Sequence, residues 1–167
     1  MGRNDEQVRR YSLLCLTVEE DGRTEGIVFV RKDDGHPVES YRRRLSFFGS
    51  APENSEDLAP AEHLTLALTP QLPAPFIATF VPLATTTSIQ DVEKTDSRGR
   101  LRVTVYNVQI GESDLEFIDY EKLQSPAAYQ GAPVFLSWKE LQSMVADEFL
   151  PDILDAVHQL FPQHFPR

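Results

Sequence analysis

The chain has 167 residues, of which 41% are hydrophobic, and this length and content suit one well-buried domain rather than two. Its formal net charge of -10 argues against binding to duplex nucleic acid, because neutralising the phosphates needs a basic face. It has no apolar stretch long enough to span a membrane and no apolar signal core near Met1, so we expect a cytoplasmic protein with no membrane partner. The single cysteine, Cys15, lies in an apolar run, which predicts a buried structural thiol.

The N-terminal third predicts three strands. Residues 11–18 and 26–32 form apolar runs, and Asp21-Gly22 between them is a strong turn signal, so we expect a hairpin. Residues 41–48 predict the third strand, which leads into a turn at Gly49.

Three consecutive arginines, Arg42, Arg43 and Arg44, are the main basic cluster. On a strand, Arg42 and Arg44 would share one face and form a patch for a phosphate or an acidic partner. The alternative is a solvated strand edge that deters aggregation.

A helix is predicted for residues 58–68. Asp57 is a plausible N-cap, and Pro70 prevents the helix from continuing. An apolar stripe at steps of three and four residues indicates the buried face of this helix, and it consists of Leu58, Ala61, Leu64 and Leu68.

The middle of the chain predicts a strand, a loop and a second strand. Residues 76–87 predict a strand of mixed pattern that ends near Pro82, and residues 88–99 are charged and turn-rich, which indicates an exposed loop. Residues 101–110 alternate clearly and predict a central strand with a core on one side, paired with the strand at 76–87.

The C-terminal part predicts a strand at 132–136 followed by two helices. Ser137 begins the first helix, and Glu140 three residues later completes a capping box. Residues 151–161 form the second, with Pro151 in its first turn and an apolar face.

The segment from Phe47-Phe48-Gly49 through Glu56 to Gln71 resembles the signature of the Nudix hydrolase family. That signature has a Gly-Gly turn, an isolated Glu, a helical Arg-Glu-x-x-Glu-Glu and a final Gly. Gly49 and Glu56 match it, whereas Ser50 replaces the second glycine. The remaining signature positions hold Leu64, Thr65, Leu68, Thr69 and Gln71.

The resemblance implies an α/β (α+β) fold, an α/β/α sandwich around a mixed β-sheet. We expect one Nudix-like domain over residues 1–167, with a flexible N-terminus at 1–9 and a tail at 162–167.

The missing acids bear on activity, because magnesium takes hard, charged oxygen ligands and Thr65 and Thr69 offer only neutral hydroxyls. We therefore favour a catalytically silent protein, without catalytic residues, metal or cofactor, that senses a nucleotide-like molecule or binds a protein partner. The candidate ligand-binding residues are Arg31, Arg42, Arg44 and Phe48, of which Arg31 matches a basic position that the family has on its second strand. Aromatic side chains for a base-stacking pocket would be Tyr41, Phe47, Phe48, Tyr106 and Trp138.

The alternative is a divergent magnesium-dependent nucleoside diphosphate-type pyrophosphohydrolase. Its acids would be Glu53, Glu56 and those of the loop 112–121, and Glu56 is the candidate metal ligand. A homodimer stays open, as does the possibility that the resemblance is accidental and the chain is another α+β domain.

Overall fold

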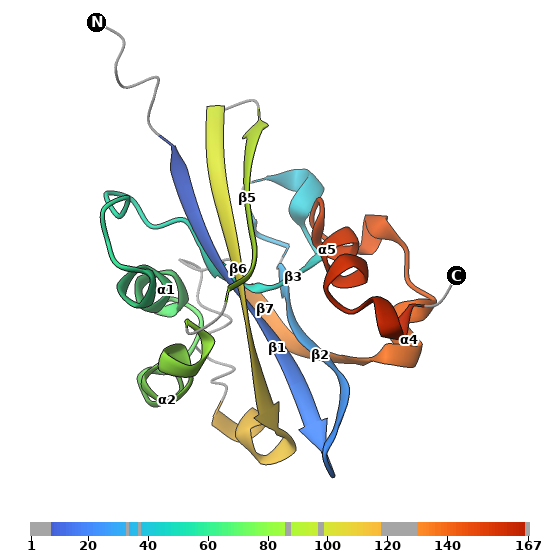
Figure 1. The fold of residues 1–167 in the computed structure, drawn as a ribbon. Helices are drawn as coiled ribbons and strands as arrows, with labels where there is room; N and C mark the ends of the chain where they lie inside the picture. The colour runs from blue at the N-terminus through green and yellow to red at the C-terminus, as the bar shows by residue number, and fades with distance from the viewer. Residues whose placement is uncertain are drawn as a thin grey trace, which may run out of the picture.

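The computed structural model describes residues 8–32, 34–36, 38–85, 88–96, 99–117 and 130–165. A mixed sheet forms the middle layer of the molecule. Helices α1 (Pro60–Leu68) and α2 (Ala74–Ala84) lie on one side of it, and α4 (Trp138–Gln142) and α5 (Ile153–Leu160) lie on the other (Figure 1). The predicted α/β/α sandwich is confirmed. None of the helices in these ranges is long and apolar enough to cross a membrane.

The predicted hairpin is formed by β1 (Arg9–Glu20) and β2 (Arg23–Lys32). Asp21 and Gly22 have φ of 52° and 81°, the left-handed backbone that a two-residue hairpin turn of type I′ requires. Cys15 on β1 is fully buried, and its burial raises the pKa of the thiol well above the ordinary value. The structural role predicted for this cysteine fits that position.

The two strands of the hairpin separate near the open end of the hairpin, and two short strands lie between them. Pairing of β1 with β2 runs from Leu16↔Val28 towards the turn. Beyond that point β3 (Leu45–Ser46) pairs with β2, and β4 (Phe48–Ser50) pairs with residues 12–14 of β1. The segment 45–50 therefore bridges the two hairpin strands and carries Gly49 into the middle of the sheet.

The prediction of one strand over residues 41–48 was wrong. A 3-10 helix covers Glu39–Tyr41, and Arg43 has a left-handed φ of 66°, which breaks an extended chain before β3 begins. Because Arg42 and Arg44 lie in this turn, the predicted strand face that they would share does not exist.

The strand β6 (Gly99–Gly111) is central, as predicted, but its neighbours and its burial differ from the prediction. It pairs in parallel with β1 and antiparallel with β5 (Ser88–Asp96), which occupies the segment expected to be a loop. The charges on β5 suit an edge strand, because they form ion pairs with arginines of β6. Both faces of β6 are covered, with Val105 packed towards α5 and Tyr106 towards α1 and α2.

The segment 76–87 was expected to be a strand, but its described part belongs to α2. A proline in the first turn favours the start of this helix. The side chains buried against the sheet recur at helical spacing, and they are Phe76, Ile77, Val81 and Ala84. Pro82 lies on the exposed side of α2. It has no N–H for the carbonyl of Ala78 four residues earlier, and Ala78 is exposed to water. Helical periodicity outweighed the strand preference of single residues, and the predicted pairing of this segment with β6 does not occur.

The helix α1 starts two residues later than predicted. Its N-cap is Ala59 and its first residue is Pro60, so Asp57 lies in the preceding turn and does not cap it. A proline at the first helical position has the required φ and needs no N–H partner, which explains the start.

The C-terminal elements largely match the prediction. The strand β7 (Gln130–Ser137) pairs with β2, and Ser137 and Glu140 form the predicted capping box at the start of α4. Within the segment expected to be a tail, Pro162–His164 form a 3-10 helix that packs on α4. The rings of His164 and Trp138 stack with their centroids 4.0 Å apart, and the His164 carbonyl accepts from Gln142.

Candidate functional site

A cavity of about 360 Å³ lies between the sheet and the start of α5. Its floor is apolar, because alternate residues of β1 and β6 point to this face: Leu13, Leu101, Val103 and Val105, with Phe47 from the β3–β4 bridge. A pocket of this size with an apolar floor and few polar groups is typical of small-molecule sites.

Cationic side chains supply the polar wall of this cavity. Lys32 at the end of β2 is only 9% exposed, which is unusual for a lysine and places a positive charge beside the apolar floor. Lys94 of β5 donates to Asp152 at the start of α5, with 2.8 Å between Nζ and Oδ2. Asp152 is the N-cap residue of α5 but does not cap it with its side chain, because its carboxylate is turned to Lys94.

The outward face of α1 carries hydroxyls where the Nudix signature has acids. Thr65 and Thr69 are exposed, and the Thr69 hydroxyl donates to the Thr65 carbonyl at 2.7 Å. Leu64 and Leu68 are fully buried against the sheet. On this face of α1 Glu62 is the one carboxylate, and the signature positions Thr65 and Thr69 themselves hold hydroxyls.

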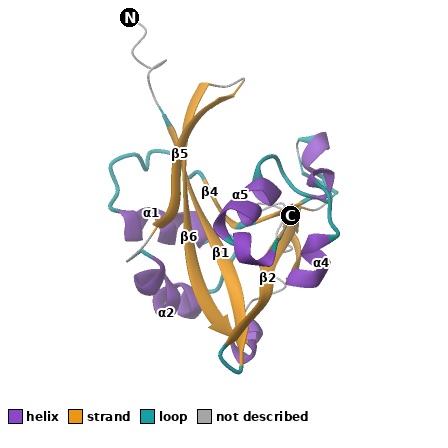
Figure 2. Cartoon of the chain, turned by 45° about the vertical axis from the view of Figure 1, so that its right-hand side comes forward, coloured by secondary structure: helices purple, strands orange, loops and turns teal. Residues whose placement is uncertain are grey.

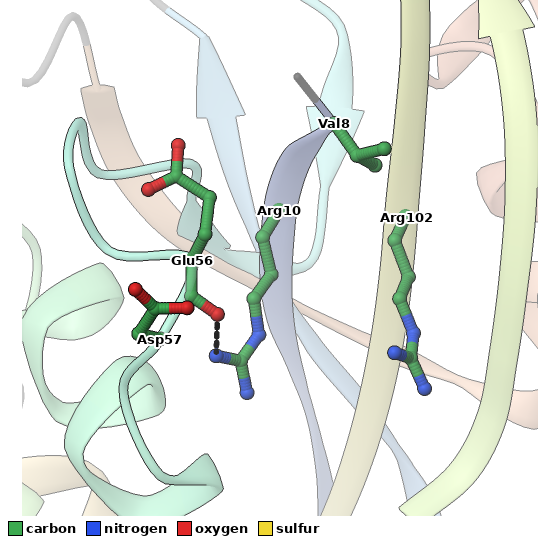
Figure 3. Close-up of a pocket in the computed structure, with 5 residues that line it drawn as sticks. All are labelled: Val8, Arg10, Glu56, Asp57 and Arg102. Carbon is green, nitrogen blue, oxygen red and sulfur yellow. Dashed lines mark hydrogen bonds between the residues drawn. The ribbon is translucent and has the colours of Figure 1, made fainter. Parts of the chain in front are cut away.

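A second, open cleft lies where β1 and β6 meet the loop before α1 (Figure 3). Arg10 of β1 and Arg102 of β6 are register partners and point the same way into it. Arg10 Nη1 donates to the carbonyls of Leu58 at 2.6 Å and Glu56 at 3.3 Å, so Arg10 fixes the loop that leads into α1. Arg102 is held by two bonds to Asp91, which lower the pKa of that carboxyl.

Beneath this loop lies a buried polar pair. Ser12 Oγ and His63 Nδ1 are 2.7 Å apart, and both side chains are fully buried. His63 Nε2 has no hydrogen-bond partner among the residues that the structure describes. Burial lowers the pKa of His63, and the nearby charge of Arg10 lowers it further. His63 is thus a neutral core side chain that links α1 to β1.

The predicted ligand-binding residues do not converge on one place. Phe48 is fully buried in the core between the sheet and helices α1 and α2. Arg31 is exposed and donates to the Arg43 carbonyl, and Arg42 is exposed and donates to the His36 carbonyl. Arg44 is half-buried, and its carbonyl accepts from the Lys32 amide.

The aromatic residues suggested for a base pocket also divide between two environments. Tyr41 and Phe47 line the cavity under α5. Phe48, Tyr106 and Trp138 belong to the core.

The acids suggested for a divergent hydrolase lie apart. Glu53 and Glu56 are exposed in the loop before α1, and Glu56 approaches Arg10 through its backbone carbonyl. Glu112 follows the far end of β6, which pairs with Glu19, nine residues along β1 from Arg10. That separation is about 30 Å at ~3.3 Å per residue. Asp119 and Glu121 fall outside the described residues. Within the described ranges no group of three or more His, Cys, Asp or Glu is placed to hold a metal ion.

Sequence reasoning missed Lys32, Lys94 and Asp152, which line the cavity. Arg31 was the basic residue chosen on β2, one position before the lysine that faces the pocket. Residues from β2, β5 and α5 meet only in the folded chain, and a single sequence without contacts gives no signal for that meeting.

Searches of family models and of curated proteins found no match. Solved structures do resemble the chain. The Nudix domain of Shewanella oneidensis NrtR, determined in complex with ADP ribose, aligns with a TM-score of 0.61 at 14% identity, covering 94% of this chain and 88% of that domain. A Nudix hydrolase from Alicyclobacillus acidocaldarius aligns with a TM-score of 0.60 at 9% identity, covering 92% and 91%. The chain therefore has a Nudix-like fold.

Proposed function

We propose that this chain is a catalytically silent Nudix-fold domain that binds a nucleotide-like ligand in the cavity between the sheet and α5. The observation that carries the proposal is the buried Lys32 beside an apolar floor, since a nucleotide combines a base whose flat face packs on apolar surface with anionic phosphates. Lys94 adds a second cation at the rim. The similar NrtR domain binds ADP ribose, a ligand of this class.

The small number of carboxylates near the proposed ligand supports the absence of catalysis. Asp152 is the one acid among the described residues that line the cavity, and it already pairs with Lys94. The hydroxyls of Thr65 and Thr69 cannot neutralise a divalent cation as carboxylates do. Diphosphate cleavage relies on such a cation to stabilise charge and to activate water, so binding without turnover fits this set of residues.

Calorimetric titration with ADP-ribose, with and without magnesium, tests the binding. We expect saturable binding that Lys32→Met weakens at least tenfold, because the variant keeps the length of the side chain and removes the charge. Lys139→Met, at an exposed position on α4, is the matched control and should bind like the parent. Absence of binding to ADP-ribose, ADP and AMP alike would refute the ligand-sensing function.

The absence of catalysis is tested by incubating the protein with ADP-ribose and magnesium or manganese and detecting AMP by chromatography. We expect no AMP above a protein-free control. Release of AMP that Glu56→Gln abolishes would instead establish the hydrolase alternative.

A further inference from the structure

An ion pair closes part of the rim of the cavity under α5. Lys94 of β5 and Asp152 at the start of α5 both line the cavity, and they lie 58 residues apart in the chain. Their side chains are 39% and 60% exposed, so water reaches the bond between them. Exposed ion pairs of this kind contribute little to stability. The contact between Lys94 and Asp152 can therefore open at small cost.

The position of α5 does not depend on this ion pair. The helix lies on the side of the sheet away from α1 and α2 (Figure 2), and its buried face consists of Ile153, Leu154, Ala156 and Val157. A second bridge joins the same two elements about two turns further along the helix, where Gln90 Nε2 donates to Gln159 Oε1 at 3.2 Å. Asp152 can thus lose Lys94 while α5 remains a wall of the cavity.

The backbone of Asp152 is also unusual for the position that it holds. Its φ is 70°, in the left-handed region, whereas an N-cap residue ordinarily has extended backbone. Its carboxylate makes no capping bond to the first turn of α5. Left-handed backbone at residues other than glycine is uncommon and gathers at ligand-binding and switch positions.

We propose that Asp152 sets the charge selectivity of the cavity, because it occupies Lys94 until a phosphate of the ligand displaces it. This inference rests on the proposed function, which supplies the nucleotide class of ligand. In the protein without ligand, the Asp152 carboxylate offsets the charge of Lys94. When the ligand binds, its phosphate replaces the carboxylate as the acceptor of the Lys94 ammonium, and the carboxylate turns to water.

Two effects of the carboxylate oppose an anionic ligand. The ligand must break the ion pair to reach Lys94, and the displaced Asp152 carboxylate stays near the phosphate and repels it. A neutral nucleoside meets neither effect, because it carries no charge. Inorganic phosphate meets both and gains nothing from the apolar floor, so Asp152 favours ligands whose base also packs there over free phosphate.

Titration of the parent and of Asp152→Asn with ADP-ribose and adenosine by calorimetry, and with inorganic phosphate by NMR, tests the proposal. Asparagine keeps the size of the side chain, removes its charge and tolerates left-handed backbone as aspartate does. The variant should bind ADP-ribose and phosphate about three- to tenfold more tightly and adenosine like the parent, since a weak ion pair and a repulsive charge are lost. In a Lys94→Met background most of the gain should disappear, because Asp152 then has no cation to occupy.

Asp155→Asn is the matched control. Asp155 is an exposed acid of the same helix and does not line the cavity, so this variant loses the same charge and should bind all three ligands like the parent. Weaker or unchanged binding of ADP-ribose by Asp152→Asn, or a gain that Lys94→Met leaves intact, would overturn this proposal while the ligand-sensing function stands.

The phosphate titration separates this proposal from the proposed function. If neither protein binds ADP-ribose, ADP or AMP but Asp152→Asn binds phosphate more tightly, the nucleotide function is refuted and the role of Asp152 is retained. If phosphate too fails to bind either protein, both are refuted.

Discussion

The side chain of Gln71 takes the place of a neighbouring strand for Gly49. Its Oε1 accepts from the Gly49 amide at 2.6 Å, and its Nε2 donates to the Gly49 carbonyl at 2.9 Å. Gln71 is 2% exposed, and Gly49 is buried in β4, which pairs with β1 on its other side. Removing the Gln71 amide therefore leaves two backbone groups without partners in the interior.

Substitution of Gln71 by methionine keeps most of the volume and removes both hydrogen bonds. Each unpaired buried group costs about 1–3 kcal/mol, so loss of both partners should make Gln71→Met lower the free energy of unfolding by ~2–6 kcal/mol. Gln71→Ala should lower it further, because it also leaves a cavity. A loss of this size is a large share of the ~5–15 kcal/mol that stabilises a typical domain.

Gln71→Glu separates hydrogen bonding from size. A carboxylate can still accept from the Gly49 amide, but its second oxygen would face the Gly49 carbonyl with no proton between them. We expect a marked loss of stability at pH 7 that is partly recovered on acidification, since protonation restores a donor at that position.

Urea unfolding with linear extrapolation measures these differences. The control is Gln159→Ala, at an exposed position of α5, where a change within about ±0.5 kcal/mol is expected. A loss below about 1 kcal/mol for Gln71→Met would refute the reasoning, because it would mean that Gly49 is as well satisfied without the glutamine.

Three other substitutions test separate features of the fold. Gly49→Ala should unfold the protein or reduce its yield severely, because φ is +133° and a Cβ would lie 2.1 Å from the Ser12 carbonyl oxygen; thermal unfolding checks this. The pKa of His63 is below its ordinary value of about 6.5 in the folded state, so the unfolded chain binds a proton more readily and stability falls as the pH drops through ~6.5; unfolding at pH 7.5 and 5.5 should show a smaller fall for His63→Gln than for the parent. Ser137→Ala should cost about 1 kcal/mol in urea unfolding, because the Ser137 hydroxyl no longer caps the helix. The pKa of Glu140 should stay lowered, since the bond from the backbone amide of residue 137 is its main cause, and should rise only slightly with loss of the hydroxyl, as NMR titration would show.

The elements that the sequence predicted well are those whose signal is local. The turn at Asp21-Gly22, the alternation along residues 101–110 and the capping box at Ser137 each depend on residues a few positions apart. Local chemistry decides such features whatever the rest of the chain does.

The elements that were mispredicted depend on distant contacts. The β5 strand looked like a loop because its charges are neutralised only across the sheet, as in Asp91 with Arg102. The α2 segment was predicted as a strand because the prediction gave more weight to its residue types than to its helical periodicity. The binding candidates on β2 and in the arginine cluster missed the cavity because its wall is assembled from β2, β5 and α5, which no local pattern connects.

Several residues in the segment that resembles the Nudix signature have clear structural roles. Leu64 and Leu68 fill the core, Gln71 holds Gly49, and Glu56 contributes its backbone carbonyl to Arg10. Each of these contacts stabilises the frame, and none of them needs a carboxylate, so the frame can persist without a metal.

The remaining signature positions, Thr65 and Thr69, are exposed on α1. The proposed ligand cavity opens on the opposite side of the sheet, next to α5. The exposed surface of α1 and α2 is therefore separate from the proposed ligand cavity. It follows that Leu83→Asp, at an exposed position of α2, should leave the affinity for ADP-ribose unchanged.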